Sequence, residues 1–472
     1  MHERIGAAIE EIWSGRLDDH LSELARHYER SGNTRKALDY LGRAGHQART
    51  RSSHAEAAWL FTSALELLKT LPETPERVQQ ELALQLGLGP ALQCIKGWTA
   101  PEVASVYARA RELCRQLGET TQLFTVLYGL SRVSFVRAQY QTAREQTQQL
   151  LSIAQNLPDA DVLLVAHWAL GQTLSMLGEL VPARTHLECA RSLYDPARHR
   201  SLAEGGFNEG VASLVYAAWT EWFLGYPDQA VARVEQARAL AEELSQTFSL
   251  CFALASSSVL HTFRREGEAA LKFADESIRL ATDHGFQQLL EYSICFCGGA
   301  LVECGQEEQA VARLHEGLAA LDALGSGAGN TRFLGWQAAA YGRLGRVEEG
   351  LAAVAEGFAV SQRTGERFFE AELHRLTGDL LLQRDAQESE SKVEGEAEVC
   401  FRRAIEVARR QQAKSLELRA TMSLARLLAS QGLRKEALAM IAEIYNWFTE
   451  GFDTADLKEA KALLDELTAL NT

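Results

Sequence analysis

Apolar and small residues recur along this chain with the spacing of paired helices, and residues 170–190 show the pattern most clearly. In LGQTLSMLGELVPARTHLECA, one apolar helical stripe ends at Gly178 and a second stripe follows it. The small residues Gly171, Ala183 and Ala190 stand where two antiparallel helices would have to approach each other closely. The stretch therefore predicts a helical hairpin with a tight turn at Gly178.

The same hairpin pattern recurs along nearly the whole chain. A turn glycine is followed five residues later by a small residue at Gly32/Ala37, Gly178/Ala183, Gly225/Ala230, Gly305/Ala310, Gly345/Gly350 and Gly432/Ala437. Where this glycine is missing, we place the equivalent small-residue register at Ala57, Val103, Ala143, Ala269 and Ala397. Successive positions are about 40 residues apart, which is typical of a helical-hairpin solenoid. The pattern resembles the longer form of the tetratricopeptide repeat (TPR). We therefore predict an all-α fold, a TPR-like right-handed superhelix of about ten hairpins.

Three longer steps in the repeat predict insertions. Residues 195–210 are polar and contain glycine, and residues 384–396 are highly charged. Residues 87–101 contain helix breakers before Pro101, which we expect to be the first residue of a helix. We expect three parts: N-terminal helices over 1–50, the solenoid over 51–450, and a capping helix over 451–472 that begins near Asp453 or Thr454.

Composition narrows the classes of partner. The chain has 472 residues, with 48 Lys and Arg against 63 Asp and Glu, so its net charge is −15. Such an acidic chain is a poor match for nucleic acid, because binding phosphates needs a basic surface. It has no apolar run of the length that spans a membrane and no signal-peptide layout at its start. The eight cysteines are scattered among apolar helical runs, and we expect reduced thiols in a cytoplasmic protein.

The sequence contains no recognisable catalytic motif. It lacks a phosphate-binding G-x-x-x-x-G-K-[ST] loop, and the glycine-rich residues 325–330 are expected to join two helices. Cys295, Cys297, Cys304 and His315 invite comparison with a metal site, but a C-x-C pair places its thiols on different sides of a helix. We therefore expect an apolar cluster there. The chain is predicted to be no enzyme and to bind neither a cofactor nor a metal.

An aromatic and charged stripe suggests a ligand groove. In a hairpin solenoid the first helix of each pair lines the concave side, and its outward stripe follows from the helical period. This stripe holds Tyr128, Arg132, Phe135, Trp168, Gln172, Trp219, Trp222, His261, Arg375, Asp379 and Arg426. Aromatic faces with neighbouring polar groups would suit a sugar, a peptide or another extended ligand. The alternative is that the tryptophans simply pack between neighbouring repeats. Buried Trp219 and Trp222 would argue against the groove as drawn here.

Several longer phrases resemble a specific family. They include HLSELARHYERSGNTRKALDYLGRAGHQA, GPALQCIKGWTAPEV and YNWFTEGFDTADLKEAKALLDEL. These resemble the C-terminal TPR region of bacterial signalling proteins that join an adenylate/guanylate cyclase, an AAA-type (STAND) ATPase and helical repeats. Activators of the maltose-regulator type share the ATPase-plus-repeat plan. The resemblance covers most of the chain, but only that C-terminal part of the family, so no catalytic residue carries over.

The resemblance implies a sensing or restraining role toward an ATPase or cyclase module. Met1 falls inside what would be a continuous helix of a larger protein, so we expect a truncated reading frame, a split gene or a stand-alone sensor piece. The first hypothesis is a non-enzymatic scaffold that binds a protein or small ligand in its groove as part of such a signalling protein. The alternative is a stand-alone regulator that binds a sugar-like or peptide ligand and acts in trans on a separate ATPase, cyclase or transcription activator.

Overall fold

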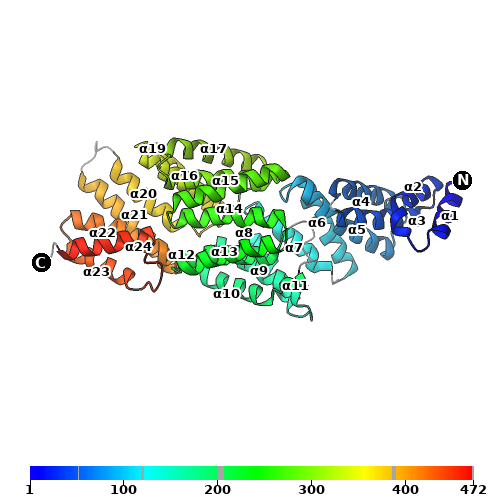
Figure 1. Cartoon of the computed structure of the whole chain (residues 1–472), viewed down its shortest axis with the longest axis horizontal. Helices are drawn as coiled ribbons and strands as arrows, with labels where there is room; N and C mark the ends of the chain where they lie inside the picture. Colours follow the sequence, from blue (N-terminus) through cyan, green and yellow to red (C-terminus); the bar gives the residue numbers. More distant parts are fainter. Residues whose placement is uncertain (52, 119–121, 200–206, 385–389, 470–472) are drawn as a thin grey trace. The chain divides into compact units, whose positions relative to one another are not determined.

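The structure, a computed structural model, describes residues 1–51, 53–118, 122–199, 207–384 and 390–469. It divides into two compact units, an N-terminal unit of residues 1–136 and a C-terminal unit of residues 137–472. This boundary lies at neither 50 nor 450, where we had placed the limits of the solenoid, and that three-part division stays a prediction. Every described element is a helix, which confirms the all-α, TPR-like solenoid (Figure 1).

The N-terminal unit consists of short helical hairpins. Its elements are α1 (His2–Ile12), η1 (Leu17–His20), α2 (Leu21–Ser31), α3 (Thr34–Thr50), α4 (His54–Leu68), α5 (Pro75–Lys96), α6 (Pro101–Leu117) and α7 (Gln122–Val136). The expected break within residues 87–101 is wrong, because α5 continues through Pro90 to Lys96. A side chain at Gly87 or Gly89 would meet the ring of Phe61 or Tyr107, so these glycines serve close packing rather than a turn. Pro101 is the first residue of α6, as predicted.

The C-terminal unit contains the regular hairpins. Its helices are α8 (Tyr140–Ala154), α9 (Ala160–Met176), α10 (Leu180–Leu193), α11 (Pro196–His199), α12 (Glu209–Phe223), α13 (Pro227–Glu243), α14 (Thr247–Phe263), α15 (Gly267–His284), α16 (Gln287–Glu303), α17 (Glu307–Ala323), α18 (Asn330–Arg343), α19 (Val347–Thr364), α20 (Glu370–Gln383), α21 (Glu390–Gln411), α22 (Lys414–Ser430), α23 (Arg434–Tyr445) and α24 (Ala455–Ala469). The predicted capping helix is α24, which follows Thr454 directly.

Two expected loops are partly helical. Residues 200–206 of the segment 195–210 and residues 385–389 of the charged segment lie outside the described residues. The rest of the charged segment, residues 390–396, is not a linker, because it forms the first turns of α21. The side-chain oxygen of Asn208 accepts a hydrogen bond from the backbone N–H of Val211 at 3.0 Å and so fixes the start of α12.

The predicted turn glycines all adopt the left-handed backbone that the hairpin requires. Their φ values run from 70° at Gly305 to 93° at Gly225. In two hairpins without glycine, Ala138 and Arg265 take the same conformation, with φ of 57° and 63°. The position of Arg265 shows that the register residue of its hairpin is the fully buried Ala270 and not Ala269. This correction makes the repeat more even, with steps of about 40 residues on both sides.

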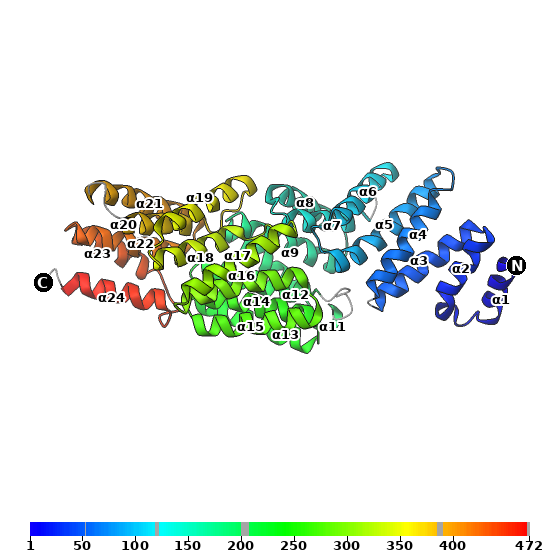
Figure 2. The ribbon, with the colours of Figure 1, turned by 90° about the horizontal axis from the view of Figure 1, so that it is seen from above.

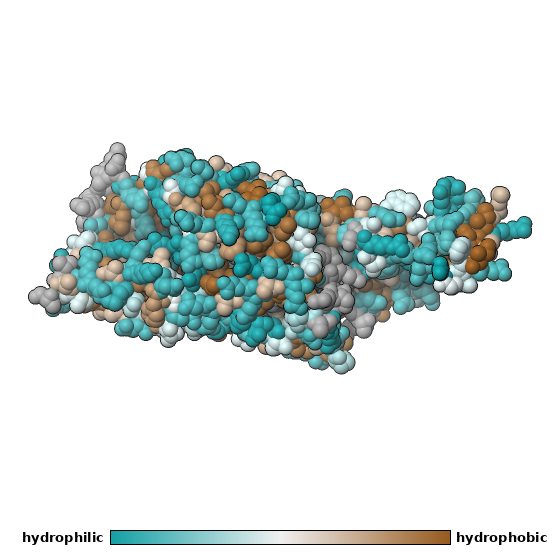
Figure 3. All heavy atoms as spheres, in the orientation of Figure 1, coloured by the Kyte–Doolittle hydropathy of each residue, from teal (hydrophilic) through white to brown (hydrophobic). Residues whose placement is uncertain are grey.

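The helices of the C-terminal unit form two layers. The first helices of successive hairpins, α9, α12, α14, α16, α18, α20, α22 and α24, pack against one another as an inner layer. The second helices pack outside them and bury a stripe of small residues, such as Ala183 and Ala190 in α10. A Cβ atom added to Gly171 would lie 2.8 Å from the side chain of Leu187, which confirms the close helix contact expected there. Hydrophilic residues dominate the face of this unit seen in Figure 3.

The C-terminal unit also closes on itself. Hydrogen bonds join Gly329 to Tyr140, Ser415 to Trp222 and Asp456 to Arg265, pairs that are 189, 193 and 191 residues apart. The nearly constant separation means that the chain returns to its own edge after about five hairpins. Figures 1 and 2 accordingly both show α22 and α24 near α12 and α14. Among the described residues, no helix is long and apolar enough to cross a membrane.

Candidate functional site

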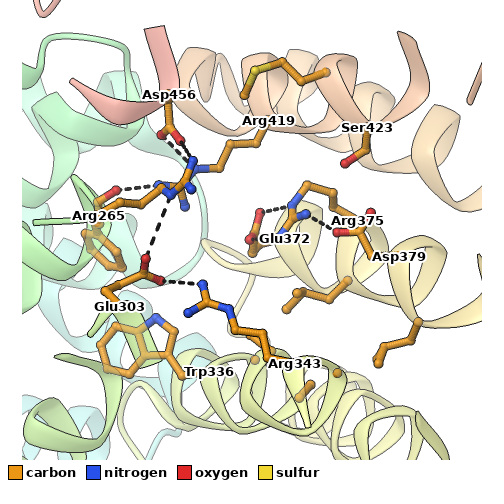
Figure 4. A pocket seen from close by; sticks show the side chains of 18 of the residues that line it. Arg265, Glu303, Trp336, Arg343, Glu372, Arg375, Asp379, Arg419, Ser423 and Asp456 are labelled. Carbon is orange, nitrogen blue, oxygen red and sulfur yellow. Dashed lines mark hydrogen bonds and ion pairs between the residues drawn. The ribbon is translucent and has the colours of Figure 1, made fainter. Parts of the chain in front are cut away.

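A pocket opens on the inner layer of the C-terminal unit. Its volume is about 270 Å³, and it is lined by α18, α20 and α22, by the last turns of α14 and α16, and by the first turns of α24 (Figure 4). All of these are first helices or the cap, so the pocket lies on the side where the repeat pattern places a groove. The hydrogen bond between Arg265, which follows α14, and Asp456 of α24 is one of the contacts by which the superhelix closes on itself. The pocket therefore lies between two parts of the superhelix that are far apart in the sequence.

Charged side chains line this pocket in equal numbers of each sign. Five arginines face five carboxylates: Arg265, Arg343, Arg375, Arg419 and Arg426 with Glu303, Glu372, Asp379, Asp456 and Glu459. Figure 4, which labels all of these except Arg426 and Glu459, shows the labelled side chains converging from several helices. The pairs differ in geometry, and they fall into a tight group and a loose group.

The tight pairs are well buried and make several contacts. Arg375 donates from Nη2 and Nε to the two carboxylate oxygens of Glu372, at 2.6 and 2.9 Å, and it also bonds Asp379. Arg419 Nε donates to Asp456 at 2.8 Å. The bidentate pair Arg375–Glu372 holds both of its side chains in one orientation, and Arg419 is held further by a hydrogen bond to the backbone oxygen of Phe263, so these groups form the fixed frame of the pocket.

The loose pairs lie nearer the solvent. Arg343 Nη2 is 3.5 Å from Glu303, and Arg426 Nη2 is 3.4 Å from Glu459. The side chains of Arg343, Arg426 and Glu459 are 41, 52 and 40% exposed, whereas those of Glu303 and Arg375 are 16 and 18% exposed. A long, single contact between exposed groups contributes little to stability. Arg343 and Arg426 can therefore exchange these carboxylate partners for a ligand at small cost, whereas Glu459 is also held by Arg265 at 2.8 Å.

The electrostatics keep the frame ionised. Burial alone would raise the pKa of the Glu372 carboxyl, but the guanidinium groups of Arg375, Arg419 and Arg265 outweigh that effect and hold its pKa below the usual range. Burial likewise opposes the charge of Arg375, but the carboxylates of Glu372 and Asp379 raise its pKa well above the usual range. The pocket therefore presents fixed charges of both signs at any physiological pH.

Arg265 occupies a special backbone position in this pocket. It stands where other hairpins have a turn glycine, and its φ of 63° is unfavourable for a residue with a side chain. Its guanidinium lies 2.8 Å from Glu459 and 3.4 Å from Asp456, both in the capping helix, and 3.9 Å from Glu303. Local strain of this kind persists where the surrounding contacts compensate for it, and it is common at binding sites.

Aromatic rings form the apolar base of the pocket. Trp336, Phe263 and Phe369 line it, with ring centroids 6.2 and 6.4 Å apart along the series Trp336–Phe263–Phe369. Trp222 lies behind this base, stacked on Phe263 at 4.8 Å and below the guanidinium of Arg419 at 5.0 Å. Trp222 therefore supports the pocket rather than facing it.

The predicted groove residues divide accordingly. Arg375, Asp379 and Arg426 line the pocket together. The exposure we expected is wrong for Phe135, Arg132, Trp168, Gln172 and Trp222, which are buried between packed helices. For Trp168, Gln172 and Trp222, burial follows from the inner layer itself, because each of its helices is covered by neighbours on several sides. We named Trp219 and Trp222 as the residues whose burial would argue against the predicted groove, and Trp222 is buried.

The remaining predicted residues are partly buried and lie outside the pocket. Trp219 donates from its indole N–H to the backbone oxygen of Ser256 at 3.2 Å, so it is engaged within the protein. His261 bonds Glu266, and its ring stacks on Phe273 of α15 at 5.3 Å. Tyr128 belongs to the N-terminal unit. Contact of Trp219, His261 and Tyr128 with a ligand or partner stays a prediction.

Sequence reasoning missed several pocket residues. Arg419 lies seven residues before Arg426 and Glu372 three before Arg375, so extending the same stripes would have found both. Arg265 and Asp456 could not be found in this way, because Arg265 stands in a turn and Asp456 in the first turn of α24, and the two meet only after the chain closes. Cys295 and Cys297 are buried in α16, and burial raises the pKa of the Cys297 thiol to about 11. Within the described residues, no group of three His, Cys, Asp or Glu side chains is arranged to hold a metal.

Comparison with known proteins supports the fold. No family model matches the chain. An uncharacterized protein of Rhizobium meliloti is 28% identical over 412 residues, which are 86% of this chain and 39% of that protein. The chain thus spans 39% of the length of this longer relative.

Solved structures of helical-repeat proteins are also similar. A Rap protein complexed with competence and sporulation factor has a TM-score of 0.54 at 10% identity, over 86% of this chain and 99% of that one. The apo quorum sensor NprR from B. thuringiensis has a TM-score of 0.45 at 16% identity, over 79% and 99%. The likeness to the Rap protein supports the TPR-like fold of the chain.

Proposed function

We propose that this chain is a non-enzymatic ligand-binding scaffold, the sensor part of a signalling protein that contains a cyclase or an ATPase module. The observation that carries the proposal is the pocket on the inner layer, where fixed charges of both signs surround an aromatic base. Such a site combines an apolar contact surface with a few groups that orient a ligand, as small-molecule and peptide sites do. The Rap protein of similar fold was solved with a bound factor, which is in keeping with this role.

The position of the pocket gives the ligand a means of control. The pocket draws on α14 and α16 from one part of the superhelix and on α22 and α24 from another. A ligand that bridges these parts prefers one separation between them, and it shifts the population toward that separation. The change in curvature would then reach a module attached to the repeats. A ligand that touched only one side would have no such effect.

The link to a cyclase or an ATPase rests on other support. The first support is the set of sequence phrases that resemble the repeat region of such proteins. The second is the length of the relative from Rhizobium meliloti, of which this chain covers 39%, so that relative is long enough to hold further domains. The DNA upstream of the Met1 codon tests this link. A phosphate-binding loop in the same reading frame would support control in cis. An ATPase or cyclase encoded separately beside it would favour the alternative, a regulator that acts in trans.

Ligand binding itself is tested with pocket variants. The double variant Arg343→Gln/Arg426→Gln removes two exposed pocket charges, and the control Arg313→Gln/Arg346→Gln removes two charges of similar exposure that lie outside the pocket. Each protein is incubated with the low-molecular-mass fraction of a bacterial lysate and examined by native mass spectrometry.

We expect the wild type and the control to retain a ligand and the pocket variant to lose it. Retention of the same ligand by all three proteins would place binding elsewhere. If the wild type retains nothing from a fraction that contains the cell's peptides and metabolites, the proposed function is wrong.

A further inference from the structure

We infer that the pocket selects a small zwitterion with an apolar body, namely a short peptide with both termini free. This inference rests on the proposed function and names the chemical class of its ligand. It follows from three observations on the same pocket: the balance of charge, the difference between tight and loose ion pairs, and the apolar surface between them.

The balance of charge argues against ligands that carry a single net charge. Each of the five pocket arginines has a carboxylate partner within 4 Å, and each of the five carboxylates has an arginine. A ligand that brings only a carboxylate must take an arginine from its partner and leave that partner uncompensated. An uncompensated charge in a partly buried site is costly. A ligand that carries both signs replaces both members of a pair and leaves the balance unchanged.

The loose pairs are the ones that a ligand can replace. The ion pairs Arg343–Glu303 and Arg426–Glu459 are long, at 3.5 and 3.4 Å, and the side chains of the two arginines are 41 and 52% exposed. Arg343 also donates to the backbone oxygen of Val302, and Glu459 also lies 2.8 Å from Arg265, which can stay in place when Arg426 exchanges its partner. The pair Arg375–Glu372 is bidentate at 2.6 and 2.9 Å and more deeply buried, so it stays in place. The ligand's carboxylate would therefore bind Arg343 or Arg426, and its ammonium group would bind Glu303 or Glu459.

The surface between the loose pairs requires an apolar body. Trp336, Leu376, Leu380 and Met422 contribute to the lining, and each is largely buried by its neighbours. The volume of about 270 Å³ is near the lower limit of sites for small ligands. It admits a few amino-acid residues and excludes a folded protein domain. Ser423 adds one hydroxyl to the wall formed by α22.

Blocked peptides test this inference directly. The probes are the tripeptide Leu-Ala-Leu with free termini, its N-acetyl form with one net negative charge, and its C-amide form with one net positive charge. Calorimetric titration into the full chain should show binding of the free tripeptide and at least a tenfold weaker affinity for each blocked form. Equal affinity for the three peptides, or preference for a blocked form, would overturn the inference, as would absence of binding by the free tripeptide.

Charge variants test the inference further, because a purely structural role of these residues would not change which of the three peptides binds best. Arg343→Gln leaves the pocket with one excess negative charge, and Glu459→Gln leaves it with one excess positive charge. Both side chains are at least 40% exposed, so the fold should tolerate either change. Arg343→Gln should shift the preference toward the C-amide peptide and Glu459→Gln toward the N-acetyl peptide, whereas the control Arg313→Gln keeps the wild-type order. Unchanged preferences in both pocket variants would refute the selection by charge.

The two proposals can fail separately. If the wild type retains a ligand from the lysate fraction in a pocket-dependent way but binds no form of the tripeptide, the scaffold function stands and the inferred ligand class is wrong. If neither a lysate ligand nor the free tripeptide binds, both proposals fail.

Discussion

The hydrogen bond between Tyr140 and Glu366 allows a direct test of the closure of the C-terminal unit. The Tyr140 hydroxyl donates to Oε2 of Glu366 at 2.9 Å, and it joins residues 226 positions apart. Both side chains are fully buried. The same carboxylate accepts hydrogen bonds from the backbone N–H groups of Gly329 at 2.9 Å and Thr331 at 3.0 Å. The hydroxyl of Thr331 donates to this carboxylate as well. Tyr140→Phe removes one of these four donors and leaves the other three in place.

The expected magnitude follows from this geometry. A hydrogen bond contributes about 0.5–1.5 kcal/mol net, and about 1.5–3 kcal/mol when one partner is charged. We therefore expect Tyr140→Phe to lower the free energy of unfolding by about 1–3 kcal/mol. In a Glu366→Gln background the same substitution should cost less, because the amide cannot accept at both of its ends. The coupling energy between the two positions should be about 1–2 kcal/mol.

The assay is urea unfolding of the wild type, the two single variants and the double variant. The pair Tyr445→Phe and Glu366→Gln is the control, since Tyr445 lies in α23. Its effects should add to within about 0.5 kcal/mol, as is usual for distant sites. If the effects of Tyr140→Phe and Glu366→Gln also add to within that limit, the two residues do not touch and the closed superhelix is wrong.

Three further predictions concern packing and pH. Ala183→Leu should overpack the contact with Gly171 and lower the free energy of unfolding by about 1–3 kcal/mol, and an unchanged urea midpoint would contradict the repeat register. Trp222→Ala should cost about 3–5 kcal/mol, because the ring is buried against Phe263; a nearly unaffected melting temperature would mean that the ring is exposed after all. Burial raises the pKa of the Glu366 carboxyl in the folded state, so folding favours its protonated form and stability falls as pH rises from the unfolded to the folded pKa. The stability of the wild type relative to Glu366→Gln should accordingly be lower at about pH 8 than at about pH 5 in urea titrations, and a gap that widens in favour of the wild type toward pH 8 would contradict this assignment.

The sequence by itself determined the repeat and its turns. A turn glycine followed five residues later by a small residue is a local signal, because the left-handed backbone of Gly178 and the close contact at Ala183 both arise within one hairpin. The same reasoning located part of the pocket, since Arg375 and Asp379 lie one helical turn apart on one face of α20. These features depend on neighbours close in sequence, and the chain encodes them directly.

Only the tertiary structure decided which large side chains are exposed. Trp168 and Trp222 share the expected outward stripe, yet they are buried, because the inner layer packs each first helix against several others. The contact of Arg265 with Asp456 joins residues 191 positions apart and depends on how far each hairpin rotates relative to the next. That rotation is the sum of many small packing contacts, and no local pattern in the sequence expresses it. The pocket therefore follows from the repeat only once the superhelix has closed.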